Sequence, residues 1–164
     1  MESTQTHEVR SQDSGEEVMK QISEYTTRGQ ISDNTVERIM LFDGRFDTAF
    51  RVTKFVVWGT DPSDTASEVS AKLMTEDLGV PNAPNIFNAD DNREIAWASH
   101  EIDNSLGTGN DFAVIDRDNL IVEDLYIWAN NAADDPINYL IEMEKYDISD
   151  WQGALAMVRN RSQT

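Results

Sequence analysis

The sequence contains no cysteine. Disulfide bonds and thiolate metal sites are therefore excluded, whereas the redox compartment stays open because a cysteine-free protein is compatible with any of them. Histidine is almost as scarce, since His7 and His100 are the two examples. The chain also lacks a G-x-S-x-G motif, so the sequence supports neither a Ser-His-Asp nor a Cys-His mechanism. We therefore predict that the chain is not an enzyme.

Basic residues are also few. Lys and Arg total 13 against 31 for Asp and Glu, which gives a formal net charge of −18. A field of this sign repels phosphate, so we expect no direct binding of nucleic acid and little attraction to anionic membranes. Apolar runs are too short for a transmembrane helix, and residues 1–18 lack the basic start and apolar stretch of a secretion signal. The expectation is synthesis in the cytoplasm.

What is present, from residue 36 onward, is a succession of short apolar or alternating runs separated by turn-rich loops. Such a pattern is typical of an antiparallel β-sandwich or a single jelly roll. We expect about eight strands, with Asp43-Gly44 as the turn of a hairpin and "NNAADDP" as a second hairpin loop. The expected strands occupy 36–59 on either side of that first turn, 68–76, 94–102, 112–116, 120–129 and 137–146.

Alternation also predicts which side chains share a face. Leu125, Ile127 and Ala129 form one such set, and a second set consists of Ile137, Tyr139, Ile141 and Met143. In the long run 46–58 one face is expected to carry Phe50, Val52, Val56 and Trp58, with Phe55 and Val57 opposite. Core packing is the favoured use of Trp58, Trp97 and Trp128.

Both ends of the chain are expected to lie outside the sandwich, which we assign to residues 36–148. Residues 1–35 are predicted to be an arm with a short helix at about 15–28, because Ser14 and Glu17 have capping-box spacing. Residues 149–164 are predicted to form a C-terminal helix and tail for similar reasons. Narrow apolar stripes on these segments would contact either the home domain or another subunit. The candidate subunit contacts are Val18, Met19, Ile22, Tyr25, Trp151 and Leu155.

Oxygen-rich loops raise the question of a metal. Calcium held by Asp90, Asp91, Asp116 or Asp118 is one interpretation, but none of these loops has the order of ligands of an EF-hand. Ordinary solvated turns are the favoured interpretation, and no cofactor is expected.

Four phrases together carry a resemblance: "DGRF" with "FRVTKFVVW", "DNREIAWAS", "IDRDNLIVEDLYIWA" and "INYLIEMEKYDISDWQGALAMVRNRSQ". Over about residues 36–164 the chain resembles small single jelly-roll coat proteins of marine and other environmental viruses. The resemblance implies a virion protein that assembles with copies of itself through its arm and terminal helix. One departure is that many such coat proteins carry a basic N-terminal arm, whereas this arm is not basic. The alternative is a carbohydrate-binding or adhesin-type β-sandwich module.

Overall fold

The computed structural model describes residues 20–64, 66–103, 108–148 and Leu155. The described part of the chain contains eight strands, which confirms the all-β expectation. In chain order they are β1 (Lys20–Ile31), β2 (Thr35–Ile39), β3 (Thr48–Gly59), β4 (Ala66–Met74), β5 (Glu94–Asp103), β6 (Thr108–Ile115), β7 (Leu125–Asn131) and β8 (Ile137–Asp147).

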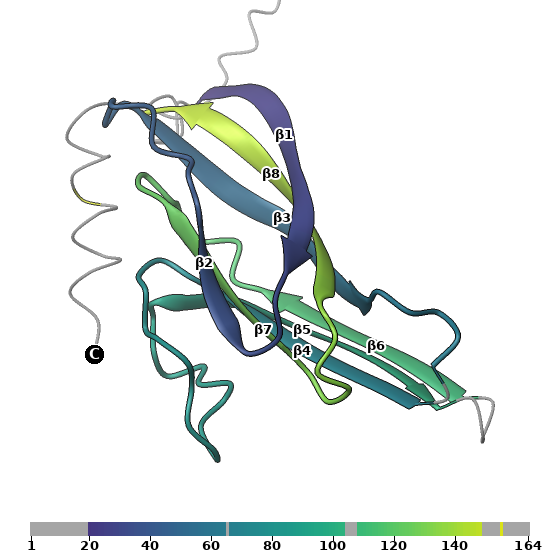
Figure 1. The fold of residues 1–164 in the computed structure, drawn as a ribbon. Helices are drawn as coiled ribbons and strands as arrows, with labels where there is room; N and C mark the ends of the chain where they lie inside the picture. The colour runs from purple at the N-terminus through teal and green to yellow at the C-terminus, as the bar shows by residue number, and fades with distance from the viewer. Residues whose placement is uncertain (1–19, 65, 104–107, 149–154, 156–164) are drawn as a thin grey trace, which may run out of the picture.

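The strands form two antiparallel sheets. The three-stranded sheet has the order β1-β8-β3, and the five-stranded sheet has the order β2-β7-β4-β5-β6. Figure 1 shows the two sheets as separate layers, with purple β1 at the outer margin of the upper one. The arrangement is a β-sandwich, as the alternation of apolar residues predicts.

The core lies between the two sheets and is built from alternate residues of the strands. Ile137, Ile141 and Met143 of β8 are buried, and Tyr139 between them is 8% exposed. From the other layer β7 contributes Leu125, Ile127 and Ala129, which are all fully buried. Both predicted faces are therefore confirmed, and each follows from the two-residue period of a strand.

A bulge in β3 changes the predicted face of that strand. The register against β8 shifts between Val52 and Lys54, so Thr53 is an extra residue. A single extra residue moves every later side chain to the opposite face. The core face accordingly consists of Phe50, Val52, Phe55 and Val57. The prediction that Val56 and Trp58 share the face of Phe50 is wrong, and Trp58 is 40% exposed instead of packed in the core.

Neither predicted hairpin forms. β2 pairs with β7 and β3 pairs with β8, so the segment containing Asp43-Gly44 crosses from one sheet to the other. Gly44 does have the positive φ, 85°, that such a turn residue supplies. The segment between β7 and β8 also connects two different sheets. A turn sequence indicates where the chain reverses. Which strands then pair depends on how the apolar faces of all the strands are buried together.

The predicted N-terminal helix is also wrong over residues 20–28, where the chain forms most of β1. The apolar spacing of Ile22 and Tyr25 suits a helix, yet Ile22, Tyr25, Thr26 and Thr27 are all residues that favour strands. Pairing with β8 then provides a backbone ladder along one side of β1, interrupted by a bulge between Gln21 and Ser23. Residues 15–19 and the predicted C-terminal helix lie outside the described residues, apart from Leu155.

Candidate interaction surfaces

β3 and β6 are the end strands of the two sheets, and the boundary between them, here called the seam, runs from Phe50 to Trp58 along β3. At one end it is closed, because the N–H of Phe50 donates to the Ile121 carbonyl and the N–H of Ile121 donates to the Phe50 carbonyl, both at 2.8 Å. Further along, Nη2 of Arg117 donates to the carbonyl oxygen of Thr53 at 3.1 Å. The two chain segments therefore run antiparallel at the start of the seam.

Beyond Thr53 the seam opens into a groove of about 270 Å³. The residues that line it are Val56, Val57 and Trp58 of β3, Ser99 and His100 of β5, and Asp111, Phe112 and Ala113 of β6. Trp58 and Phe112 are 40% and 47% exposed. Nδ1 of His100 contacts Oδ1 of Asp111, so these two polar side chains already hold each other. The groove thus combines two accessible aromatic rings with a polar pair.

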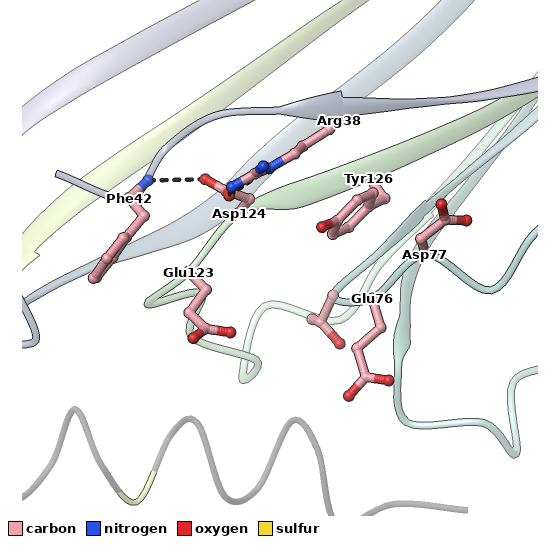
Figure 2. Close-up of a pocket in the computed structure, with 8 residues that line it drawn as sticks. Arg38, Phe42, Glu76, Asp77, Glu123, Asp124 and Tyr126 are labelled. Atoms are coloured by element: carbon pink, nitrogen blue, oxygen red, sulfur yellow. Dashed lines mark hydrogen bonds and ion pairs between the residues drawn. The ribbon is translucent and has the colours of Figure 1, made fainter. Parts of the chain in front are cut away.

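A larger cavity of about 410 Å³ lies near the start of β7 (Figure 2). It is acidic, since Glu76, Asp77, Glu123 and Asp124 line it together with Arg38, Phe42, Thr75 and Tyr126. Figure 2 shows the guanidinium of Arg38 against the carboxylate of Asp124, with Glu76 and Asp77 across the cavity.

Asp124 is a structural residue of this cavity. Its side chain is 8% exposed, and Oδ1 accepts hydrogen bonds from the N–H groups of Leu41 at 2.9 Å and Phe42 at 3.1 Å. Nε of Arg38 donates to Oδ2 at 2.6 Å. Burial alone raises the pKa of Asp124, but the N–H donors and Arg38 outweigh burial and hold the pKa below its ordinary value. The carboxylate thereby fixes the segment that crosses between the sheets.

The other acids of the cavity do not converge. Oδ1 of Asp77 accepts the N–H of Gly79 at 2.9 Å, and Glu76 lies 3.9 Å from Arg93. Across the described ranges, no group of three or more His, Asp or Glu side chains is arranged to hold a metal ion. The cavity is a polar hollow whose best-defined carboxylate already has its partners.

The structure brings the two predicted calcium loops side by side, because Nδ2 of Asn119 donates to the Asn92 carbonyl at 3.3 Å. Within the first loop, Asp91 pairs with Arg93 at 2.6 Å, and this hydrogen bond lowers the pKa of Asp91. Asp90 is exposed in the same loop. In the second loop, Oδ1 of Asp116 accepts the N–H of Asp118 at 3.1 Å. The contacts are those of turns, and calcium binding stays a prediction.

The predicted subunit contacts fall into two groups. Ile22 and Tyr25 lie on β1 and are 46% and 47% exposed, and Leu155 is 55% exposed. Val18, Met19 and Trp151 lie outside the described residues. Sequence reasoning missed the exposure of Trp58, Phe112 and Val114, which lie on β3 and β6. No local pattern marks these two strands as the ends of their sheets, since that depends on the order of all the strands.

The comparisons with protein families and with curated proteins add no relative. No protein-family model and no curated protein matches the chain. Within the residues described here, no helix has the length and apolar character needed to cross a bilayer. The class that the fold defines is an antiparallel β-sandwich.

Proposed function

We propose that the chain is a self-assembling coat subunit of a virus particle, built on a single jelly roll. The observation that carries the proposal is the order of pairing. β1 pairs with β8, β2 with β7 and β4 with β5. These are three of the four nested pairs that form when an eight-stranded chain is folded once into a long double-stranded ribbon. Rolling that ribbon up then brings β8 beside β3 and β7 beside β4, and both of these pairs are present.

The fourth nested pair would join β3 with β6. β6 instead extends the five-stranded sheet by pairing with β5. The start of the seam nevertheless has the expected geometry, because the Phe50–Ile121 bridge is antiparallel and lies just beyond β6. A jelly roll in which one bridge from β3 to the chain after β6 stands in place of the last strand pair accounts for both observations.

An assembly role is supported by the surface of this roll. Ile22 and Tyr25 expose apolar area on an outer strand, and exposed aromatic residues are frequent anchors at interfaces between subunits. A charge of −18 on each copy opposes assembly, so salt or divalent ions should favour it by screening the repulsion. The assembled state belongs to a virion, with synthesis in the host cytoplasm.

The test is electron microscopy and light scattering of the purified chain across salt and calcium titrations. We expect closed shells or regular oligomers whose yield rises with ionic strength. Ile22→Gln should reduce that yield, whereas the neighbouring exposed change Gln21→Ser should not. A chain that stays monomeric through both titrations would contradict the proposal.

A second candidate is a carbohydrate-binding or adhesin-type module, and the groove between β3 and β6 favours it. Trp58 and Phe112 offer accessible ring faces, and Ser99, His100 and Asp111 offer hydrogen-bonding groups in the same groove. Flat apolar rings next to polar side chains match the two kinds of surface on a sugar ring.

This candidate is tested with a glycan array, followed by calorimetry on any glycan that binds. Trp58→Ala should abolish binding, whereas Phe87→Ala, which removes an aromatic side chain that is 38% exposed outside the groove, should leave it unchanged. Binding that is insensitive to both substitutions would place the glycan elsewhere and remove the support for this candidate.

A further inference from the structure

β1 is the end strand of the three-stranded sheet, and its hydrogen-bonded strand neighbour in the described part of the chain is β8 (Figure 1). The strand has 12 residues, and every residue from Lys20 to Thr26 is exposed. Sheet edges are usually blocked by shortness, by proline or by a bulge. β1 is long and contains no proline, and its bulge at Gln21/Ser23 leaves the remainder regular. Among the described residues nothing pairs with its outer edge, so the charged side chains on that edge decide which strand can join it.

The backbone groups on that open edge can be assigned from the neighbouring ladders. Phe50 uses its N–H and carbonyl on the side away from β8, and the N–H of Ile148 donates to the Asp47 carbonyl at 2.7 Å. The backbone N–H and carbonyl groups of the even-numbered residues of β8 thus point toward β3, and those of the odd-numbered residues point toward β1. Tyr25 and Thr27 are the β1 partners of Met143 and Ile141, so their backbone groups face β8. The backbone groups of the alternate residues, from Glu24 through Thr26 to Arg28, point outward.

The side chains at the same three positions form a self-complementary charge pattern. Glu24 and Arg28 are exposed, lie on the same face as each other, and flank the neutral Thr26. Glu24 lies opposite Glu144 of β8, so its own sheet places a like charge beside it. Neither Glu24 nor Arg28 takes part in any ion pair found among the described residues. The edge therefore carries one acid and one base at equal distances from a central residue.

We propose that two copies of the chain pair antiparallel through β1, about a two-fold axis at Thr26. In this register Glu24 of each copy lies opposite Arg28 of the other. The two-fold axis therefore creates two equivalent Glu24–Arg28 ion pairs in the dimer. Moving the axis to Glu24 or to Arg28 would place like charges opposite each other. The pairing joins the two three-stranded sheets into one continuous sheet. It deepens the proposed function by naming the surface that a second copy uses, and it does not itself require a shell.

Charge exchange tests the pairing. Glu24→Arg and Arg28→Glu each create like-charge pairs across the axis, and each should raise the dimer Kd about tenfold in sedimentation equilibrium at low salt. The double variant Glu24→Arg/Arg28→Glu restores opposite charges and should recover most of the affinity. Both side chains are exposed, so circular dichroism should show an unchanged monomer fold. A double variant as weak as the two single variants would overturn the proposal.

Cysteine cross-linking tests the register, since the natural chain has no cysteine. Residues paired in this way have Cα atoms about 5.5 Å apart, which is within the range that a disulfide spans. Thr26→Cys should therefore give disulfide-linked dimers on mild oxidation. Gln30→Cys is the matched control on the same edge, because its two copies would lie about 27 Å apart. Cross-linking through residue 30 instead of residue 26 would refute the register.

The two proposals fail in different ways. Dimers that cross-link through Thr26→Cys but never form shells would contradict the coat function and support the β1 pairing. Shells that form with an unchanged yield from the Glu24→Arg variant, and without cross-linking through residue 26, would support the coat function and overturn the β1 pairing.

Discussion

The buried ion pair between Lys72 and Glu94 should be the main interaction that holds the loop between β4 and β5 against these two strands. Nζ of Lys72 lies 3.1 Å from Oε2 of Glu94, and the two side chains are 4% and 3% exposed. Lys72 also donates to the Ile86 carbonyl at 2.8 Å. Oε1 of Glu94 accepts from the N–H of Asn88 and from Nε1 of Trp97, both at 3.1 Å. The pair thus connects two strands to the loop that covers them.

The size of the effect follows from leaving one charge without its partner. Removing one member of a buried pair typically costs about 3 to 5 kcal/mol. We therefore expect Lys72→Met and Glu94→Gln each to lower the free energy of unfolding by about 3 kcal/mol. For a chain of 164 residues this corresponds to a fall in Tm of about 10 °C. The double variant should lose much less than the sum, because neither charge is then left alone.

Urea unfolding at pH 7, followed by tryptophan fluorescence, measures all three variants and closes the double-mutant cycle. Lys54→Met is the matched control, since Lys54 lies 3.6 Å from Glu142 in a pair whose side chains are 52% and 45% exposed. Its effect should stay below about 1 kcal/mol. Single variants at Lys72 and Glu94 that lose less than the control, or that add without coupling, would refute the reasoning.

Two further stability predictions concern β1 and the acidic cavity. Gly29→Ala should lower the free energy of unfolding in urea by about 1 to 3 kcal/mol, because a Cβ there would lie 2.7 Å from the hydroxyl oxygen of buried Tyr139. Adding Tyr139→Phe should recover part of the loss. If it recovers nothing, another contact limits the site. Asp124→Asn should destabilise the fold at pH 7 and matter less as the pH falls. The folded-state pKa of Asp124 is depressed, so its contribution is complete above the ordinary carboxyl pKa of about 4 and is lost at lower pH. Unfolding curves between pH 7 and 3 that keep a constant gap from the natural chain would contradict this assignment.

The sequence was most informative where one strand face packs on the core. The alternation in β7 and β8 predicted Leu125, Ile127, Ile141 and Met143 as core residues, because a strand buried on one side must repeat every two residues. Composition and turn spacing similarly predicted an all-β chain of about eight strands.

Pairing and register were beyond the reach of local patterns. The extra residue at Thr53 is recognisable only once β3 is aligned with β8, and the bulge decides whether Trp58 is core or surface. The apolar spacing of Ile22 and Tyr25 fits a helix, whereas their residue types favour a strand, so local sequence could not settle β1. The groove and the acidic cavity both combine residues from distant strands, which only the sheet order brings together.

The position of β7 and β8 has a consequence for how the molecule is made. Each is an inner strand of its sheet, and each follows in the chain all the strands with which it pairs. On the ribosome, β1 and β3 must therefore wait without their shared neighbour until β8 has emerged, and β2 and β4 must wait for β7. The decisive pairing step therefore comes only after β7 and β8 have been made, is slow because its contacts are long-range, and is most exposed to error while the nascent strands remain unpaired.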